Sequence, residues 1–192
     1  MRQGITFVLA VVVAGIAFGY LNGYVRAHGG QGASEISMAT GALGFAVVLV
    51  SIVSTFAGNR NIARASSEAE ARAKQFRTAP SGLVSVYIFR EAVYARFLGL
   101  DLYVDEVLIG QTRGRTFFCL SVPPGSHRLS AVNPQDKTRS DLDLVLRAET
   151  SFVQQSLKLG ATGAKHSLSI CEPEFAQSRI NRCRMLVPNK VV

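Results

Sequence analysis

The sequence predicts an N-terminal two-helix transmembrane hairpin followed by an all-β antiparallel sandwich domain. Residues 5–25 and 38–58 contain no charged side chain, and each stretch, as a helix rising ~1.5 Å per residue, is long enough to cross a ~30 Å hydrocarbon core. After residue 82 apolar residues alternate with polar ones, and turn residues recur roughly every 8 to 12 positions. The expected parts are two transmembrane helices in 1–58, a basic helical linker in 59–81 and the β-sandwich domain in 82–192.

Basic residues differ in number on the two sides of the second apolar stretch. The segment 26–37 holds only Arg26, whereas 59–81 holds five Lys or Arg. Because positive flanks stay in the cytoplasm, we expect a multi-pass protein of the bacterial inner membrane with both termini in the cytoplasm. The first stretch follows a single charge, Arg2, and exceeds the length of a signal-peptide core, so we expect it to stay uncleaved. The candidate contacts to lipid or to a partner are Arg60, Arg64, Arg72, Lys74 and Arg77.

Small residues recur at four-residue spacing in the first apolar stretch. Gly15, Gly19 and Gly23 form two overlapping G-x-x-x-G steps, a spacing that lets helix backbones approach closely in lipid. The helix that packs there is either the second one, with Gly41 and Gly44, or a helix of another subunit. Since neither stretch carries an ionisable group, an ion or proton carrier acting alone is not expected.

The linker has the composition of a helix. Alanine is frequent in it, and Ser67 with Glu70 matches a capping box. Glu68 with Arg72, and Glu70 with Lys74, are favourable i,i+4 pairs. A Pro-Ser-Gly turn then ends the helix.

The strands of the predicted sandwich are short. Leu142, Leu144 and Leu146 alternate with other residues and give the clearest half-buried strand. Apolar runs on both sides of Asp105-Glu106 predict a hairpin turn there, and no long helix intervenes, which favours a sandwich over a βαβ fold. The expected strands cover 83–89, 100–104, 107–110, 115–122, 127–132, 142–146, 150–159, 167–171 and 183–187, with a single helical turn at 174–181.

Three stretches carry a resemblance to a known family. The strand at 87–90 matches Y-x-[FY]-R, the hairpin at 102–110 matches v-x-v-D-G-x-x-v-G, and 117–129 matches a v-x-P-G-x-H-x-l strand pair. The sandwich resembles a family of uncharacterised bacterial envelope domains, similar to the small surface-layer domains named for a Pro-Glu-Gly-Ala motif. Glu106 stands where that family usually has the hairpin glycine. The resemblance implies a sandwich fold and no catalytic residue.

The side chains able to carry chemistry are scattered. Cys119, Cys171 and Cys183 have no C-x-x-C spacing, so we expect core or surface thiols, although in an outward-facing domain Cys171 and Cys183 could be joined. The histidines lie far apart, and no metal site or cofactor is expected. Asp141 and Asp143 share a strand face opposite the leucines, which favours a solvated side over an acid/base pair.

These observations favour a membrane-anchored β-sandwich that acts as a binding or scaffolding module, an accessory subunit of an inner-membrane protein assembly. The alternative is an envelope domain outside the cytoplasm that binds cell-wall or surface polymer. An enzyme has the least support, because no nucleophile, base and orienting group can be assembled from the sequence. The net charge of +8 is spread along the chain, so the expected partners are membrane lipid and a protein or second copy bound through the helices, with no nucleic acid.

Overall fold

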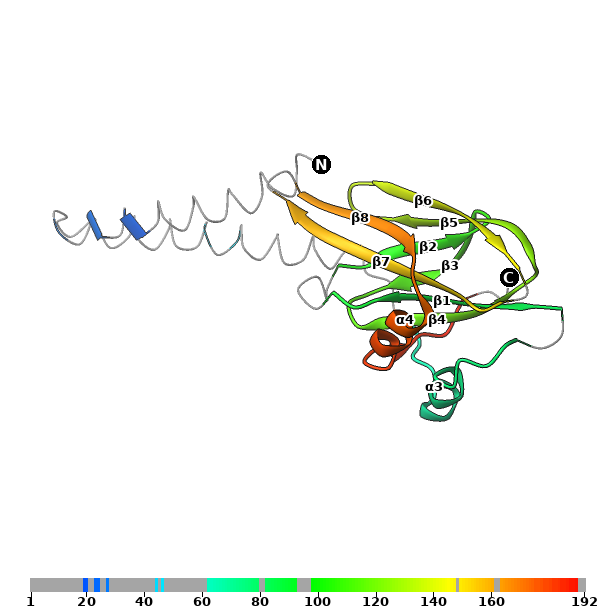
Figure 1. Cartoon of the computed structure of the whole chain (residues 1–192). Helices are drawn as coiled ribbons and strands as arrows, with labels where there is room; N and C mark the ends of the chain where they lie inside the picture. Colours follow the sequence, from blue (N-terminus) through cyan, green and yellow to red (C-terminus); the bar gives the residue numbers. More distant parts are fainter. Residues whose placement is uncertain are drawn as a thin grey trace. The chain divides into compact units, whose positions relative to one another are not determined.

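The computed structural model describes residues 19–20, 23–24, 27, 44, 46, 62–79, 82–92, 98–147, 149–160 and 163–189. The chain divides into two compact units, Met1–Ala57 with Gly160–Gly163, and Gly58–Leu159 with Ala164–Val192. The described positions within 1–57 are helical. The second unit holds the strands and the two short helices that are labelled in Figure 1.

The described residues form nine strands and two labelled helices. The strands are β1 (Val84–Arg90), β2 (Leu100–Val104), β3 (Val107–Thr112), β4 (Thr116–Val122), β5 (Gly125–Val132), β6 (Arg139–Leu146), β7 (Ser151–Gly160), β8 (Gly163–Ile170) and β9 (Arg184–Met185). The helices are α3 (Ser67–Ala73) and α4 (Pro173–Ile180).

These strands form two sheets. One has the order β8-β7-β1-β4-β9 and the other the order β3-β2-β5-β6. In the five-stranded sheet β1 pairs antiparallel with β4 but parallel with β7, and β4 pairs parallel with β9. The four-stranded sheet is antiparallel throughout. The first sheet is therefore mixed. The chain between β1 and β7 forms β4 of this sheet and all four strands of the second sheet.

The two sheets bury their facing sides against each other in a main core. Val86 and Ile88 of β1 meet Leu102 of β2 and Leu144 of β6 there. Removing side chains of this size from water stabilises a fold by about 1.5–3 kcal/mol each. Leu144 is 4% exposed while Asp143 is exposed, so the alternation expected at 142–146 is confirmed.

A second apolar cluster, here called the outer cluster, covers the opposite face of the five-stranded sheet. Side chains alternate along a strand, so β1 directs Val86 and Ile88 to the main core and Tyr87 and Phe89 to the outer cluster. Helix α4 lies over this face (Figure 1), and because the main core covers the other face, all seven residues of β1 are buried. The buried members are Tyr87, Phe89, Phe117, Phe152, Ala176, Ile180 and Cys183.

Helix α3 is shorter than the helix expected in the linker. Its N-cap is Ser66, one residue before the expected cap, and the Ser66 hydroxyl accepts a hydrogen bond from Ala69 N at 3.2 Å. The two expected i,i+4 pairs form, with Glu68–Arg72 at 3.6 Å and Glu70–Lys74 at 2.7 Å.

Contacts tie this segment to the sheets. Glu70 also accepts a hydrogen bond from Met185 N at 3.1 Å, and the Tyr87 hydroxyl donates to Ala73 O at 2.8 Å. The Phe76 ring lies 5.3 Å from that of Tyr87. Residues 62–76 therefore pack as part of the β-rich unit and are not a detached spacer.

The predicted membrane anchor requires correction. Throughout the part of the chain that the structure describes, no helix is both long enough and apolar enough to cross a membrane. The two labelled helices are short, seven and eight residues. The prediction of a multi-pass inner-membrane protein with transmembrane helices at 5–25 and 38–58 and cytoplasmic termini is overturned on this finding. Most of both stretches lies outside the described residues.

The predicted fold class is wrong in its other half as well. Two facing sheets do form, but the larger is mixed, and α3 and α4 belong to the same unit, so the domain is neither purely antiparallel nor all-β. The parallel β1–β7 pairing joins residues 65 positions apart in the sequence, such as Val86 and Ser151 (151 − 86). Alternation of apolar residues identifies a strand and carries no information about its neighbours.

Candidate functional site

The structure describes four of the five basic residues expected to contact lipid or a partner. Arg64 forms an isolated β-bridge beside β9, and Arg72 and Lys74 are held in pairs within α3 and its cap. The backbone carbonyl of Arg77 accepts a hydrogen bond from a serine of β1. Arg60 lies outside the described residues. Binding of lipid or a partner through these residues stays a prediction.

The glycine stripe is only partly described. Gly15 lies outside the described residues, and Gly19 and Gly23 are helical. No described atom lies within 4 Å of a Cβ built at Gly19 or Gly23. Helix packing through this stripe stays a prediction.

The β2–β3 turn is fixed by its two acidic side chains. Asp105 and Glu106 have φ of 48° and 64°, the left-handed backbone that two-residue hairpin turns use. Asp105 accepts a hydrogen bond from Arg128 N at 2.8 Å and lies 2.6 Å from His127 Nδ1. Both carboxylate oxygens of Glu106 pair with Arg139. The expected hairpin at Asp105-Glu106 is confirmed, and it is bound to β5 and β6.

The contacts of this turn also occupy the ring nitrogens of His127. Partial burial alone would raise the pKa of Asp105, but the hydrogen bonds from Arg128 N and His127 hold that pKa below its ordinary value. The second ring nitrogen, Nε2, lies 3.0 Å from Pro123 O, which can only accept. Both ring nitrogens of His127 are thus engaged in fixing the turn. A metal ligand or a catalytic base would need one of them for its own bond.

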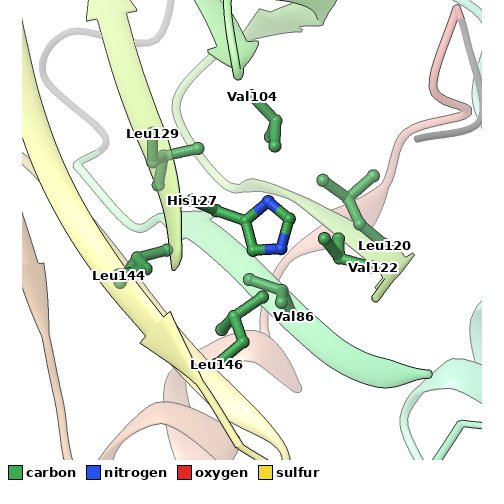
Figure 2. Close-up of a pocket in the computed structure, with 8 residues that line it drawn as sticks. All are labelled: Val86, Val104, Leu120, Val122, His127, Leu129, Leu144 and Leu146. Atoms are coloured by element: carbon green, nitrogen blue, oxygen red, sulfur yellow. The ribbon is translucent and has the colours of Figure 1, made fainter. Parts of the chain in front are cut away.

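A small cavity between the sheets ends against the His127 ring (Figure 2). The other side chains that line it are aliphatic and come from both sheets. Its volume is about 10 Å³, the space of one water-sized sphere. A buried water needs roughly two to four polar partners, and aliphatic walls offer none. The cavity is a packing gap of the main core and not a ligand site.

All three cysteines lie in or against the outer cluster, although they are far apart in sequence. Cys183 is buried in the cluster, and Cys119 and Cys171 pack against it. All are free thiols, so Cys171 and Cys183 are not joined. Burial raises the pKa of Cys183 to about 11 and also raises the pKa of Cys119 and Cys171. Because the thiolate is the reactive form, burial makes each thiol less reactive; Cys183 is a core thiol, and Cys119 and Cys171 are partly exposed thiols.

Polar side chains border the main core at the end of β1 that holds Arg90. This polar layer consists of Arg90, Thr112, Gln155 and His166. Arg90 continues the inward row of Val86 and Ile88 and is fully buried, as are Thr112 and, at 1% exposure, Gln155. The Thr112 hydroxyl hydrogen-bonds to Gln155 Oε1, which joins β3 of one sheet to β7 of the other.

The remaining contacts of the polar layer reach loops next to it. Arg90 Nη1 donates a hydrogen bond to Leu98 O at 2.7 Å. His166 Nε2 lies 3.2 Å from both the hydroxyl and the carbonyl oxygen of Thr138, just before β6. Burial lowers the pKa of His166, and the charge of Arg90 lowers it further, although Thr138 and Asp136 oppose the shift. His166 is therefore neutral at pH 7.

The sandwich has a closed side and an open side. On the closed side, Leu186 N donates to β4, Val187 N donates to Ala63 O at 3.0 Å, and Asn189 N donates to Ile109 O of β3 at 2.7 Å. The segment after β9 thus pairs with both sheets and covers their edges. On the open side lie the edges of β8 and β6, each paired with one neighbouring strand. The contact of His166 with Thr138 links these two edges, which lie side by side in Figure 1.

Comparison with known proteins gives one informative similarity. The chain is similar to an uncharacterised protein of Haemophilus influenzae (strain ATCC 51907 / DSM 11121 / KW20 / Rd), with 29% identity over 126 residues, which is 64% of this chain and 73% of that protein. No protein-family model and no solved structure matches the chain. The site is therefore argued from its own geometry.

Sequence reasoning found the hairpin turn and missed the polar layer and the open side. One signal was present: Arg90 ends a run of β-forming residues in which every second side chain faces the core. Gln155 and His166 gave no signal, because their inward direction depends on the register of β7 and β8. Among the described residues, no group of three His, Cys, Asp or Glu is placed to hold a metal ion.

Proposed function

We propose that the β-rich unit is a protein-binding module that takes up an extended polypeptide segment as an added strand on the free edge of β8. The observation that carries this proposal is the difference between the two sides of the sandwich. The chain's own segments pair with the edges on the closed side, whereas among the described residues β8 pairs only with β7. Strand addition to such an edge is a common mode of peptide recognition. The proposal assigns no catalytic step.

The backbone groups of β8 that face outward can be identified. Cys171 N donates to Phe152 O of β7 at 3.0 Å. In an antiparallel hairpin, successive residues direct their N–H and C=O groups alternately to the two sides. The N–H and C=O groups of His166, Leu168 and Ile170 consequently point away from β7. An added strand would find donors and acceptors at every second residue of this edge.

The two edges of the open side differ in charge. The β6 edge carries Arg139, Asp141 and Asp143, with Arg139 bound to Asp141 at 2.7 Å. Charged residues on an edge strand oppose pairing with another chain. The exposed residues of β8 are Lys165, two serines and Ile170, whose side chain is 62% exposed. The edge of β8 is therefore the better acceptor of a partner strand.

A proline substitution that keeps the hydrogen bonds between β8 and β7 tests this proposal. Ile170→Pro removes an outward N–H without removing a bond to β7, while Ile170→Ser keeps that N–H and loses only the side chain. A photo-crosslinking amino acid at Ser167 should capture a protein, and the same group at Val187 on the closed side is the control. The captured segment is then synthesised, and its affinity is measured by fluorescence anisotropy.

The expected outcome is at least a tenfold loss of peptide affinity in Ile170→Pro and a change under threefold in Ile170→Ser. Equal capture from both sides of the sandwich, or equal affinity of the two variants, would refute strand addition. Capture of carbohydrate in place of protein would favour the alternative of binding to surface polymer.

A further inference from the structure

A buried amide in the polar layer has half of its hydrogen-bonding capacity unused. Gln155 is 1% exposed, and its Nε2 has no hydrogen-bond partner among the described residues. Its Oε1 accepts from the Thr112 hydroxyl, which also lies 3.3 Å from Leu100 O. If the amide is turned by 180°, Nε2 donates to Thr112 and Oε1 takes the position that Nε2 has here. In the orientation of the structure, the amide nitrogen of Gln155 faces the layer unsatisfied.

His166 brings a second unsatisfied atom to the same layer. Its Nε2 lies 3.2 Å from Thr138 O, and a carbonyl can only accept, so Nε2 carries the hydrogen. The ring is neutral, because burial lowers the pKa of His166 and the charge of Arg90 lowers it further. The buried Nδ1 is then a lone-pair acceptor, and no described residue donates to it.

The strand register brings these two atoms to one region. Val153 on β7 and Leu168 on β8 belong to the main core, so Gln155 and His166, each two residues away, face the same interior. The hydrogen bond from Cys171 N to Phe152 O sets a register in which Gln155 lies across from Leu168, diagonal to His166. Diagonal neighbours are roughly 7–8 Å apart at the backbone. Both side chains extend from the backbone into the same interior, so a molecule that makes two hydrogen bonds of about 2.8 Å each can connect them.

We propose that the polar layer is a binding site for one internal water molecule, which bridges Gln155 and His166 and joins β7 to β8 through their side chains. The ligand must donate to His166 Nδ1, which excludes an anion without a proton. It must also accept from Gln155 Nε2 or, in the turned amide, donate to Oε1. Water does both, and buried waters are usually held by about three such polar partners.

The test uses the full chain labelled with ¹⁵N and water-selective NOE and ROE spectra. The Gln155 side-chain NH₂ should show a dipolar cross-peak to a water that stays bound for longer than a nanosecond. The signal should disappear in His166→Phe, which removes the acceptor and fills the space. Because the Thr112 hydroxyl exchanges with solvent and lies beside Gln155, the measurement is repeated in Thr112→Val, where the signal should persist.

Each result decides the proposal. Absence of the cross-peak in the wild-type chain would overturn it, as would its loss in Thr112→Val with the fold intact. A second measurement is the melting temperature of Gln155→Met. If water satisfies the amide, this variant should melt lower. A higher melting temperature would show that the amide is an unsolvated polar group, and the proposed water site would be wrong.

Discussion

Replacing Gly110 with alanine should destabilise the domain, even though alanine is ordinarily the better residue in a strand. A Cβ built at Gly110 lies 2.8 Å from Cζ and 3.3 Å from Cε1 of Phe118, across the main core. Unstrained carbon atoms stay about 3.5–4.0 Å apart. Phe118 is fully buried among residues of both sheets, so its ring has no open space to move into.

The magnitude follows from two opposing effects. Overpacking a well-filled core costs about 1–3 kcal/mol. Removing a glycine from a strand interior contributes roughly 0.5–1 kcal/mol in the other direction, through the unfolded chain. We expect Gly110→Ala to lower the free energy of unfolding by about 1–2 kcal/mol. Urea denaturation followed by circular dichroism measures this change.

A double-mutant cycle with Phe118→Leu identifies the cause. That substitution alone leaves a cavity, and it should cost at least about 1 kcal/mol. In the double variant the new methyl group occupies part of that cavity, so the two losses should not add, with a coupling of about 0.5 kcal/mol or more. Additive losses, or an alanine variant as stable as the wild type, would refute the close contact between Gly110 and Phe118.

Three other outcomes are expected. Leu144→Asp should unfold the domain, because it buries an unpaired charge in the main core, while Asp143→Ser on the solvated face should change the melting temperature little; similar losses in both would contradict the strand assignment. Glu106→Gly should leave the urea midpoint nearly unchanged, since glycine relieves the left-handed backbone while only an exposed pair with Arg139 is lost. A clearly lower midpoint would make that pair essential to the turn. The folded-state pKa of Asp105 is lowered, so its contribution to stability is present above the unfolded pKa near 4 and is lost as the pH falls through the lower folded value. The melting temperature of Asp105→Asn should therefore depend less on pH below about 4 than that of the wild type. Parallel plots of melting temperature against pH for the two proteins would contradict this.

Local patterns in the sequence predicted local structure well. The alternation at 142–146 and the turn at Asp105-Glu106 follow from side-chain period and from residues that tolerate a left-handed backbone. The pairs Glu68–Arg72 and Glu70–Lys74 follow from helical spacing. Each of these features depends on residues within a few positions of one another.

Features that depend on distant residues were not predictable. The parallel pairing of β1 with β7 places β1 inside the five-stranded sheet, and the main core and the outer cluster bury its two faces; no pattern within β1 reports its neighbours. The direction of Gln155 and His166 into the polar layer follows from the same long-range register. The apolar composition of 5–25 and 38–58 predicted a membrane hairpin, but composition alone does not show which helices form, and none able to cross a membrane occurs in the described part of the chain.

The position of the three thiols gives the outer cluster a built-in reporter of local motion. A thiol reagent reaches Cys183 only after a local opening of the outer cluster, because the side chain is 1% exposed. Cys119 and Cys171 are partly exposed and react without that step. The ratio of the slow labelling rate to the fast rates thus measures how often the cluster opens around Cys183 while the two sheets stay packed, a fluctuation that melting curves average away.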